Sequence, residues 1–236
     1  MTLVQTTAEK IKTKVDWAIT VRPADFDEVR IPSQSSLFPL VYDAAVSIHG
    51  RMIPAVDASD FDEQSHFTTQ GSDWVQSSSD WNANLQSWRI YQSGQFVLLL
   101  AVRTDWVENP VLRQVPYPEG KTFPLWDSMA TFVAIYEFAA RLSSTIAGSS
   151  EMVVTTSIRN IQGAQLVQDN LRKTSLRHYV FPEQSYEYPS GKATPIAREA
   201  LLANPRQFAA EAGNDLLHHF GFKSTVDSVA LWQSEF

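Results

Sequence analysis

The strongest pattern of hydrophobic positions is a pair of strand-like segments separated by a tight turn. Residues 85–92 and 95–103 flank the dipeptide Ser93-Gly94, a composition typical of antiparallel hairpins. The second segment contains the unbroken apolar run FVLLLAV, which indicates a strand covered on both faces. We therefore predict that this hairpin forms the centre of a β-sheet.

Further strands are predicted where apolar and polar residues alternate or where β-branched residues cluster. In residues 15–22, Trp17, Ile19 and Val21 occupy every second position before Pro23 ends the pattern. Residues 151–159 contain MVVTTSI, which is rich in β-branched side chains. Shorter strands are expected at residues 45–49, 165–168, 178–181 and 185–188.

Helices are predicted where apolar residues recur at three- and four-residue steps. The longest is expected over residues 125–147, with Gly148 as a left-handed stop. A second is expected over residues 205–220, where Asn204 and Gln207 have the spacing of a capping box. Shorter helices are expected at residues 35–45 and 225–233. By contrast, residues 51–80 lack periodicity and predict a long loop, and the proline-rich residues 109–123 predict an irregular connection.

This order of elements favours the α+β class, because strands and helices do not alternate regularly. We expect an antiparallel or mixed sheet with the central hairpin, packed by the long helix and by the C-terminal helices. Residues 1–14 are expected to be a flexible or helical lead-in, and residues 15–236 a single domain. A chain of 236 residues with 44% hydrophobic residues is large enough for a cooperative core.

Composition and charge exclude several classes of site. The chain has no Cys, so it forms no disulfide, thiolate zinc site or cysteine nucleophile. Its formal charge of -7 gives no general attraction to nucleic acid or to anionic membranes. Neither an apolar run of about 18 residues nor an apolar signal core is present. We therefore expect a soluble, cytoplasmic protein without a membrane partner.

Known catalytic motifs are absent: the sequence has no Walker loop, dinucleotide fingerprint, nucleophile elbow or HExxH. We expect no cofactor and no catalytic activity. The alternative is a metal-dependent nuclease, because Asp57, Asp60, Asp62 and His66 could ligate Mg²⁺ or Mn²⁺. These residues lack EF-hand spacing, and no strand alternates an acid with a Lys as in PD-(D/E)xK nucleases. A solvated acidic loop is therefore the preferred interpretation.

A basic stretch offers a third function. Arg172, Lys173 and Arg177 lie close together, with His178 beside them. They could contact a nucleic-acid backbone through charge alone. A solvated loop with weak surface ion pairs explains the same residues, and it is the preferred interpretation.

Aromatic residues around the predicted hairpin are more distinctive. Several Trp residues lie beside Asp residues, which can accept hydrogen bonds from buried indole N–H groups. Because side chains alternate along a strand, Trp88 and Ile90 should share one face, and Arg89 and Tyr91 the other. We expect Trp88 in the core. Trp81, Arg89 and Tyr91 are the candidate surface for a protein partner or small effector, although structural packing of the hairpin explains them too.

Six segments together resemble a known arrangement: W-x-I-x-V-R-P at 17–23, RIP at 30–32, DWV at 73–75, the run at 78–106, IYEFAARL at 135–142 and NPRQFAAEAGNDLLHHFGF at 204–222. The chain resembles an uncharacterised bacterial family that occurs behind Schlafen-type AlbA domains, in proteins described as DNA-binding or ATP-binding. Those two activities belong to the AlbA part, which is not recognised here. The family's Gly-Trp-Asp-x-Pro-His stretch is replaced by HGRMIP at 49–54. The resemblance implies an interaction or sensing module in bacterial regulation or antiviral defence.

Overall fold

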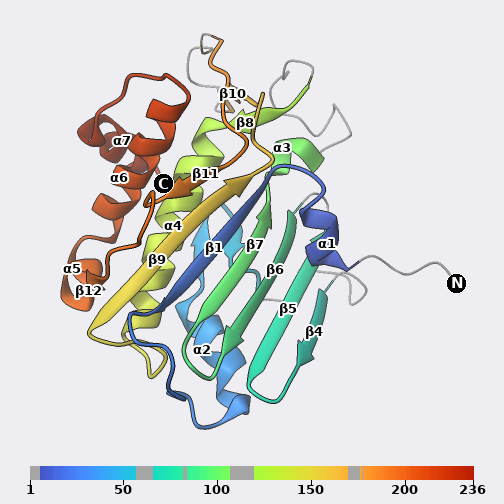
Figure 1. Ribbon diagram of the computed structural model, residues 1–236, viewed down its shortest axis with the longest axis vertical. Coiled ribbons are helices and arrows are strands. Elements are labelled where there is room, and N and C mark those ends of the chain that lie inside the picture. The colour runs from blue at the N-terminus through green and yellow to red at the C-terminus, as the bar shows by residue number, and fades with distance from the viewer. Residues whose placement is uncertain (1–5, 57–65, 82–83, 107–119, 170–175, 177) are drawn as a thin grey trace, which may run out of the picture.

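The computed structural model describes residues 6–56, 66–81, 84–106, 120–169, 176 and 178–236. Its main sheet has the strand order β11-β9-β1-β7-β6-β5-β4, with β12 also paired to β9, and its paired strands are antiparallel (Figure 1). The strands are β1 (Asp16–Pro23), β4 (His66–Gln70), β5 (Trp74–Trp81), β6 (Asn84–Tyr91), β7 (Phe96–Ala101), β9 (Glu151–Arg159), β11 (Tyr186–Tyr188) and β12 (Ile196–Ala197).

Two small sheets and the helices complete the described fold. β2 (Val46–Ile48) pairs with β3 (Arg51–Ile53), and β8 (Thr122–Pro124) pairs in parallel with β10 (Gln165–Val167). A 3₁₀ turn spans Gln34–Ser36. The α-helices are α1 (Thr7–Ile11), α2 (Leu37–Ala44), α3 (Arg103–Trp106), α4 (Leu125–Ser143), α5 (Arg198–Ala203), α6 (Pro205–His219) and α7 (Val226–Gln233). The arrangement confirms the α+β class.

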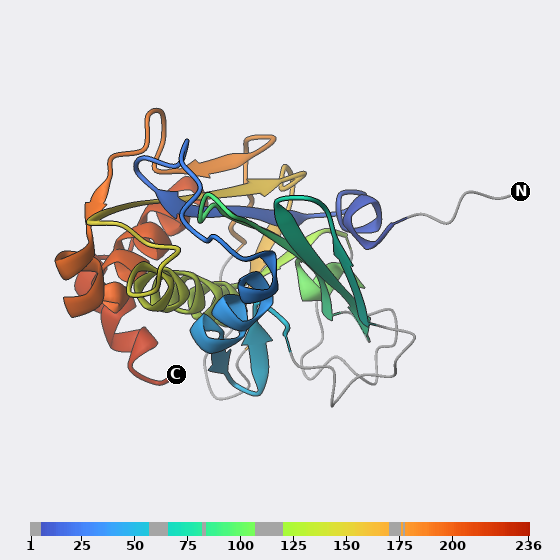
Figure 2. The same ribbon diagram turned by 90° about the horizontal axis from the view of Figure 1, so that it is seen from below.

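The large helices lie on one side of the main sheet. Figure 2 shows α4 beneath the strands, with α2 on one side of it and the C-terminal helices on the other. Helix α4 packs against α2 and α6 as well as against β1 and β9. It is buried around most of its circumference for this reason. The short helix α1 packs on the opposite face, at one end of β5, β6 and β7.

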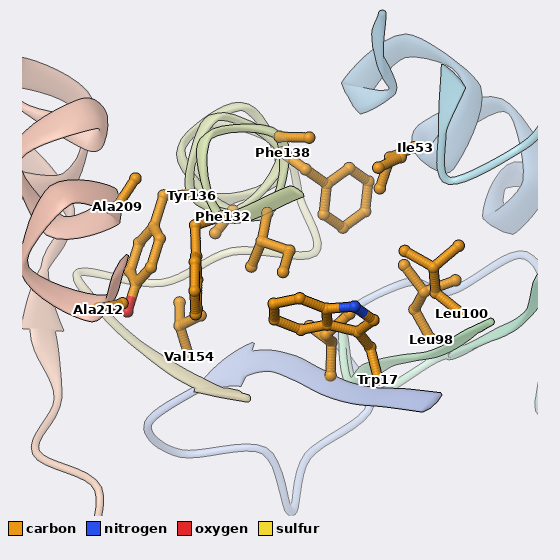
Figure 3. Close-up of a cluster of buried hydrophobic side chains, with 14 of the residues drawn as sticks. Trp17, Ile53, Leu98, Leu100, Phe132, Tyr136, Phe138, Val154, Ala209 and Ala212 are labelled. Atoms are coloured by element: carbon orange, nitrogen blue, oxygen red, sulfur yellow. The ribbon is translucent and has the colours of Figure 1, made fainter. Parts of the chain in front are cut away.

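The core fills the space between the sheet and α4. Trp17 on β1 packs edge-to-face against Phe132 on α4, with ring centroids 5.1 Å apart. Leu98 on β7 points into the same layer (Figure 3). Tyr136, also on α4, points instead toward α6, where Ala212 leaves room for its ring (Figure 3). One hydrophobic cluster therefore joins the sheet, α4 and α6.

The predicted hairpin is confirmed as β6 and β7, and β7 lies between β1 and β6 in the middle of the sheet. The expectation that β7 is covered on both faces is wrong. Phe96, Leu98 and Leu100 are buried against the helices, whereas Val97 and Leu99 are only half-buried on the opposite face. An unbroken apolar run therefore does not require a helix layer on each side of its strand.

The prediction of a loop over residues 51–80 is also wrong, because β3, β4 and all but the last residue of β5 lie within it. β5 is rich in serine, and the hydroxyls of Ser78 and Ser87 on β6 lie 2.9 Å apart across the strands. Such cross-strand hydrogen bonds satisfy buried hydroxyls, so a polar sequence can form a strand near a sheet edge. Hydrophobic alternation could not reveal it.

Several helix boundaries differ from the expected ones. Helix α4 ends at Ser143 instead of residue 147, where the hydroxyl of Ser143 donates to the carbonyl of Ala140. Gly148 is not in the left-handed region. Asn204 precedes α6 but makes no capping hydrogen bond through its side chain. Residues 178–181 form only an isolated bridge through Val180 instead of a strand.

Trp88 is the side chain whose removal should damage the core most clearly. It is 2% exposed, lies against Phe38 and Phe96, and donates from Nε1 to the carbonyl of Ala55 at 2.7 Å. We expect Trp88→Ala to lower the free energy of unfolding by about 3–5 kcal/mol, through lost burial and a residual cavity. Urea denaturation measures the change. Leu231→Ala, at a 69% exposed position, is the control and should shift stability little.

Candidate functional site on the open sheet face

The face of the main sheet opposite α4 is called the open face below. Strand register places its side chains in cross-strand rows. One row runs through Thr155, Thr20, Val97, Arg89, Gln76 and Thr69, and the next through Ser157, Ala18, Leu99, Ser87, Ser78 and Phe67. Most of these side chains are short, and Ser78 and Ser87 are buried, whereas Arg89, Val97 and Phe67 are at least partly exposed.

Arg89 is the charged centre of this face. Its Nε and Nη2 both donate to the side-chain oxygen of Gln76, at 3.0 and 2.6 Å. Its Nη1 donates to the hydroxyl of Tyr91 at 3.3 Å. The guanidinium carbon lies 4.1 Å from the ring centroid of Trp74, which is a close cation–π contact. The side chain is therefore held on three sides in one orientation.

Trp74 is itself held in position by the turn that precedes β5. A Cβ added at Gly71 would overlap the indole ring, so the absence of a side chain there lets the ring lie against the backbone. The side-chain amide of Gln34 donates to the carbonyls of Gly71 and Trp74 and ties this turn to the segment before α2. Arg89 therefore packs on an indole ring whose backbone is hydrogen-bonded to the segment before α2.

The charge of Arg89 has no ionic partner in the part of the chain that the structure describes: none of the salt bridges there includes it. A second cation of the open face is similarly held. Arg22 lies over the ring of Phe26, 4.2 Å from its centroid, and donates to the carbonyls of Pro23 and Ala24. Both arginines therefore present a positive charge on a side chain that an aromatic ring and hydrogen bonds hold in place.

The opposite end of the open face is closed. Ile11 of α1 packs with Leu85 and Ala101, and Lys10 forms an ion pair with Asp80 at 2.8 Å. Asp16 and Arg159 form an ion pair across β1 and β9.

Asp16 is fully buried at that closed end. Its burial raises the pKa of the carboxyl, and the guanidinium of Arg159 opposes this shift. The carboxylates of Asp80 and Asp16 at this end are therefore already paired with cations, whereas Arg89 has no ionic partner among the described residues.

Of the predicted binding residues, the structure brings Arg89 and Tyr91 together on the open face, with Trp88 on the other side as expected. Trp81 pairs with Asn84 at the opposite end of β5 from Trp74. The candidate surface expected from the sequence does not include Trp74 and Gln76, because the pattern of residues 51–80 predicts a loop. Once the register is known, the pairs Trp74↔Tyr91 and Gln76↔Arg89 identify both residues.

The predicted basic and metal-binding residues are mostly not placed. Arg172, Lys173, Arg177, Asp57, Asp60 and Asp62 lie outside the described residues, and His66 is the first residue of β4. Within the described ranges, no three His, Asp or Glu side chains form a group that could hold a metal ion.

The expectation that neighbouring aspartates hold the indole groups is not met where the structure shows them. Trp88 donates to the carbonyl of Ala55, Asp80 pairs with Lys10, and Asp105 accepts from the backbone of Val15. Buried indoles can use backbone carbonyls equally well.

A second polar cluster lies at the beginning of α4. Asp169 accepts hydrogen bonds from the backbone N–H groups of Trp126 and Asp127, at 2.7 and 2.9 Å, and so satisfies donors that a helix start leaves unpaired. Arg51 bridges Asp127 and Thr131 with distances of 2.6 and 2.7 Å. Burial, with the nearby Asp127 carboxylate, raises the pKa of Asp169 to about 6. These contacts join three parts of the fold, which is a structural role.

No family model matches this chain, and neither a curated protein nor a solved structure matches it. The resemblance to the region behind Schlafen-type AlbA domains therefore stays a prediction. Among the described residues, no helix is both long and apolar enough to cross a membrane.

Substitutions on the two faces of β6 should differ in their effect on the free energy of unfolding. We expect the double substitution Arg89→Ala and Tyr91→Ala to lower the free energy of unfolding by about 1 kcal/mol or less, because it removes half-exposed contacts. Thermal and urea denaturation of this double variant should be compared with denaturation of Trp88→Ala. If both variants are equally unstable, Arg89 and Tyr91 are structural and the open face is not a binding site.

Asp169 should make stability depend on pH. Between pH of about 4 and about 6 the native state keeps a proton on Asp169 that the unfolded chain has released. The contribution of this residue to the free energy of unfolding therefore falls as the pH rises, by about 1–3 kcal/mol.

Urea titrations at several pH values would measure this dependence for the wild type and for Asp169→Asn, which cannot titrate. The wild type should lose stability relative to the variant as the pH rises. Asp25→Asn, at an exposed position, controls for the loss of one negative charge. Parallel profiles for wild type and Asp169→Asn would contradict the assignment.

Proposed function

We propose that this chain is a non-catalytic interaction or ligand-sensing module of a prokaryotic regulatory or antiviral-defence system, and that it binds its partner on the open face. The observation that carries the proposal is Arg89, held by Trp74, Gln76 and Tyr91 but not matched by a carboxylate within the described residues.

The residue types on this face support binding. Trp, Tyr and Arg are the residues most enriched among those that dominate interface energies. Binding costs less free energy when the anchor side chains are already ordered, because little rotamer entropy is lost. Arg89 meets this condition through its three hydrogen bonds. The large helices pack on the other face (Figure 2), and Arg89, Tyr91 and Val97 are partly exposed on this one.

Blocking the face tests the proposal. Thr20 lies in the same cross-strand row as Arg89, separated from it by Val97. Thr20→Arg places a long side chain there. Leu231→Arg adds the same charge on α7, which packs against α4 and α6 on the helix side. Both variants should first be shown to be folded by circular dichroism and thermal denaturation.

The immobilised wild type, Thr20→Arg and Leu231→Arg proteins would then be exposed to lysate from the source cells and to a library of small metabolites. We expect a partner retained by the wild type and by Leu231→Arg, with affinity reduced about tenfold or more by Thr20→Arg. A partner retained equally by all three proteins would place binding elsewhere and refute the proposal.

A further inference from the structure

The geometry of Arg89 identifies the kind of group that it can bind. A guanidinium carries five N–H donors in one plane. Within the described residues three bonds are made, two to Gln76 and one to Tyr91, so two donors remain. Trp74 covers one face of the plane. The remaining donors suit a planar, two-oxygen acceptor, because arginine pairs with carboxylates in this way.

The surroundings of Arg89 are apolar as well as charged. Val97 lies directly beside it in the neighbouring strand, and Leu99 is two residues further along that strand. Both are half-buried, and Leu99 packs in part against the cluster of Ile11, Leu85 and Ala101, so each leaves only part of its apolar surface uncovered. Phe67 on β4 is 52% exposed in the row that contains Leu99. A ligand that reaches Arg89 would therefore also contact hydrophobic side chains.

We infer that the open face binds a protein segment that places one Asp or Glu carboxylate on Arg89 and rests apolar side chains on Val97, Leu99 and Phe67. This inference rests on the proposed function and specifies the partner. Charge complementarity supports it, because Arg89 and Arg22 are positive. The carboxylates of Asp80 and Asp16 at the closed end of the face already form ion pairs with other residues.

The overall charge distinguishes this partner from a nucleic acid. A nucleic acid brings a row of phosphates, and its affinity depends on many cationic contacts. The chain carries a formal charge of -7, which repels such a polyanion, whereas a single carboxylate meets the local positive charge at little long-range cost.

A peptide selection provides the probe. Random twelve-residue peptides displayed on phage would be selected on the full wild-type protein and depleted on Arg89→Gln, which keeps a polar side chain but lacks the charge. We expect the recovered peptides to share one Asp or Glu next to apolar residues. Synthetic peptides would then be measured by calorimetry and by the fluorescence of Trp74 and its neighbours.

A double-mutant cycle tests the pairing directly. Changing the shared Glu of the peptide to Gln, or Arg89 to Gln, should each weaken binding about tenfold, and the two changes together should weaken it no further. Arg89→Lys keeps the charge but loses the planar donors, so it should recover only part of the affinity. Arg89→Glu should regain binding when the peptide carries Lys in place of its Glu.

The possible outcomes separate this inference from the proposed function. Peptides that Thr20→Arg prevents from binding, but that need no carboxylate, would overturn the inference and leave the open face as the binding surface. Peptides insensitive to Thr20→Arg would refute both. An absence of selected peptides would also overturn the inference. Binding of an oligo-dT dodecamer that Arg89→Gln abolishes would overturn it too, and would indicate a nucleic acid as the partner.

Discussion

The packing of helix α4 beneath strand β1 is the interaction on which the rest of the fold depends. β1 lies between β7 and β9 in the middle of the sheet, and its Trp17 meets Phe132 of α4 edge-to-face. The sides of α4 that do not face the sheet are covered by α2 and α6. One helix therefore connects the sheet to both groups of outer helices, and loss of its contacts would expose apolar surface in all three directions.

This support from one side explains the character of the open face. A guanidinium in the core would need full compensation for lost hydration, whereas Arg89 on the half-exposed face keeps contact with water. The polar strand β5 is supported in a related way, because the hydroxyls of Ser77 and Ser78 find partners across the strands. An ordered charge on one face of a strand can therefore coexist with a well-packed core on the other face.

The sequence predicts those parts of the fold whose signal is local and apolar. The hairpin of β6 and β7, the strands β1 and β9 and the long helix α4 all follow from hydrophobic periodicity. Strands β4 and β5 could not be recognised, because Ser77 and Ser79 stand where apolar side chains would mark the core face. Arg89 and Tyr91 were predictable from alternation alone, but their contacts with Trp74 and Gln76 depend on strand register, which is a long-range property.

The alternation along β6 has a consequence for how the protein can change over evolutionary time. Trp88 and Ile90 serve the core, while Arg89 and Tyr91, the residues between and after them, serve the open face. Two selective pressures therefore act on interleaved positions of one short segment without sharing a side chain. Homologues could exchange one partner for another by altering every second residue, and the folding information in the intervening residues would be inherited unchanged.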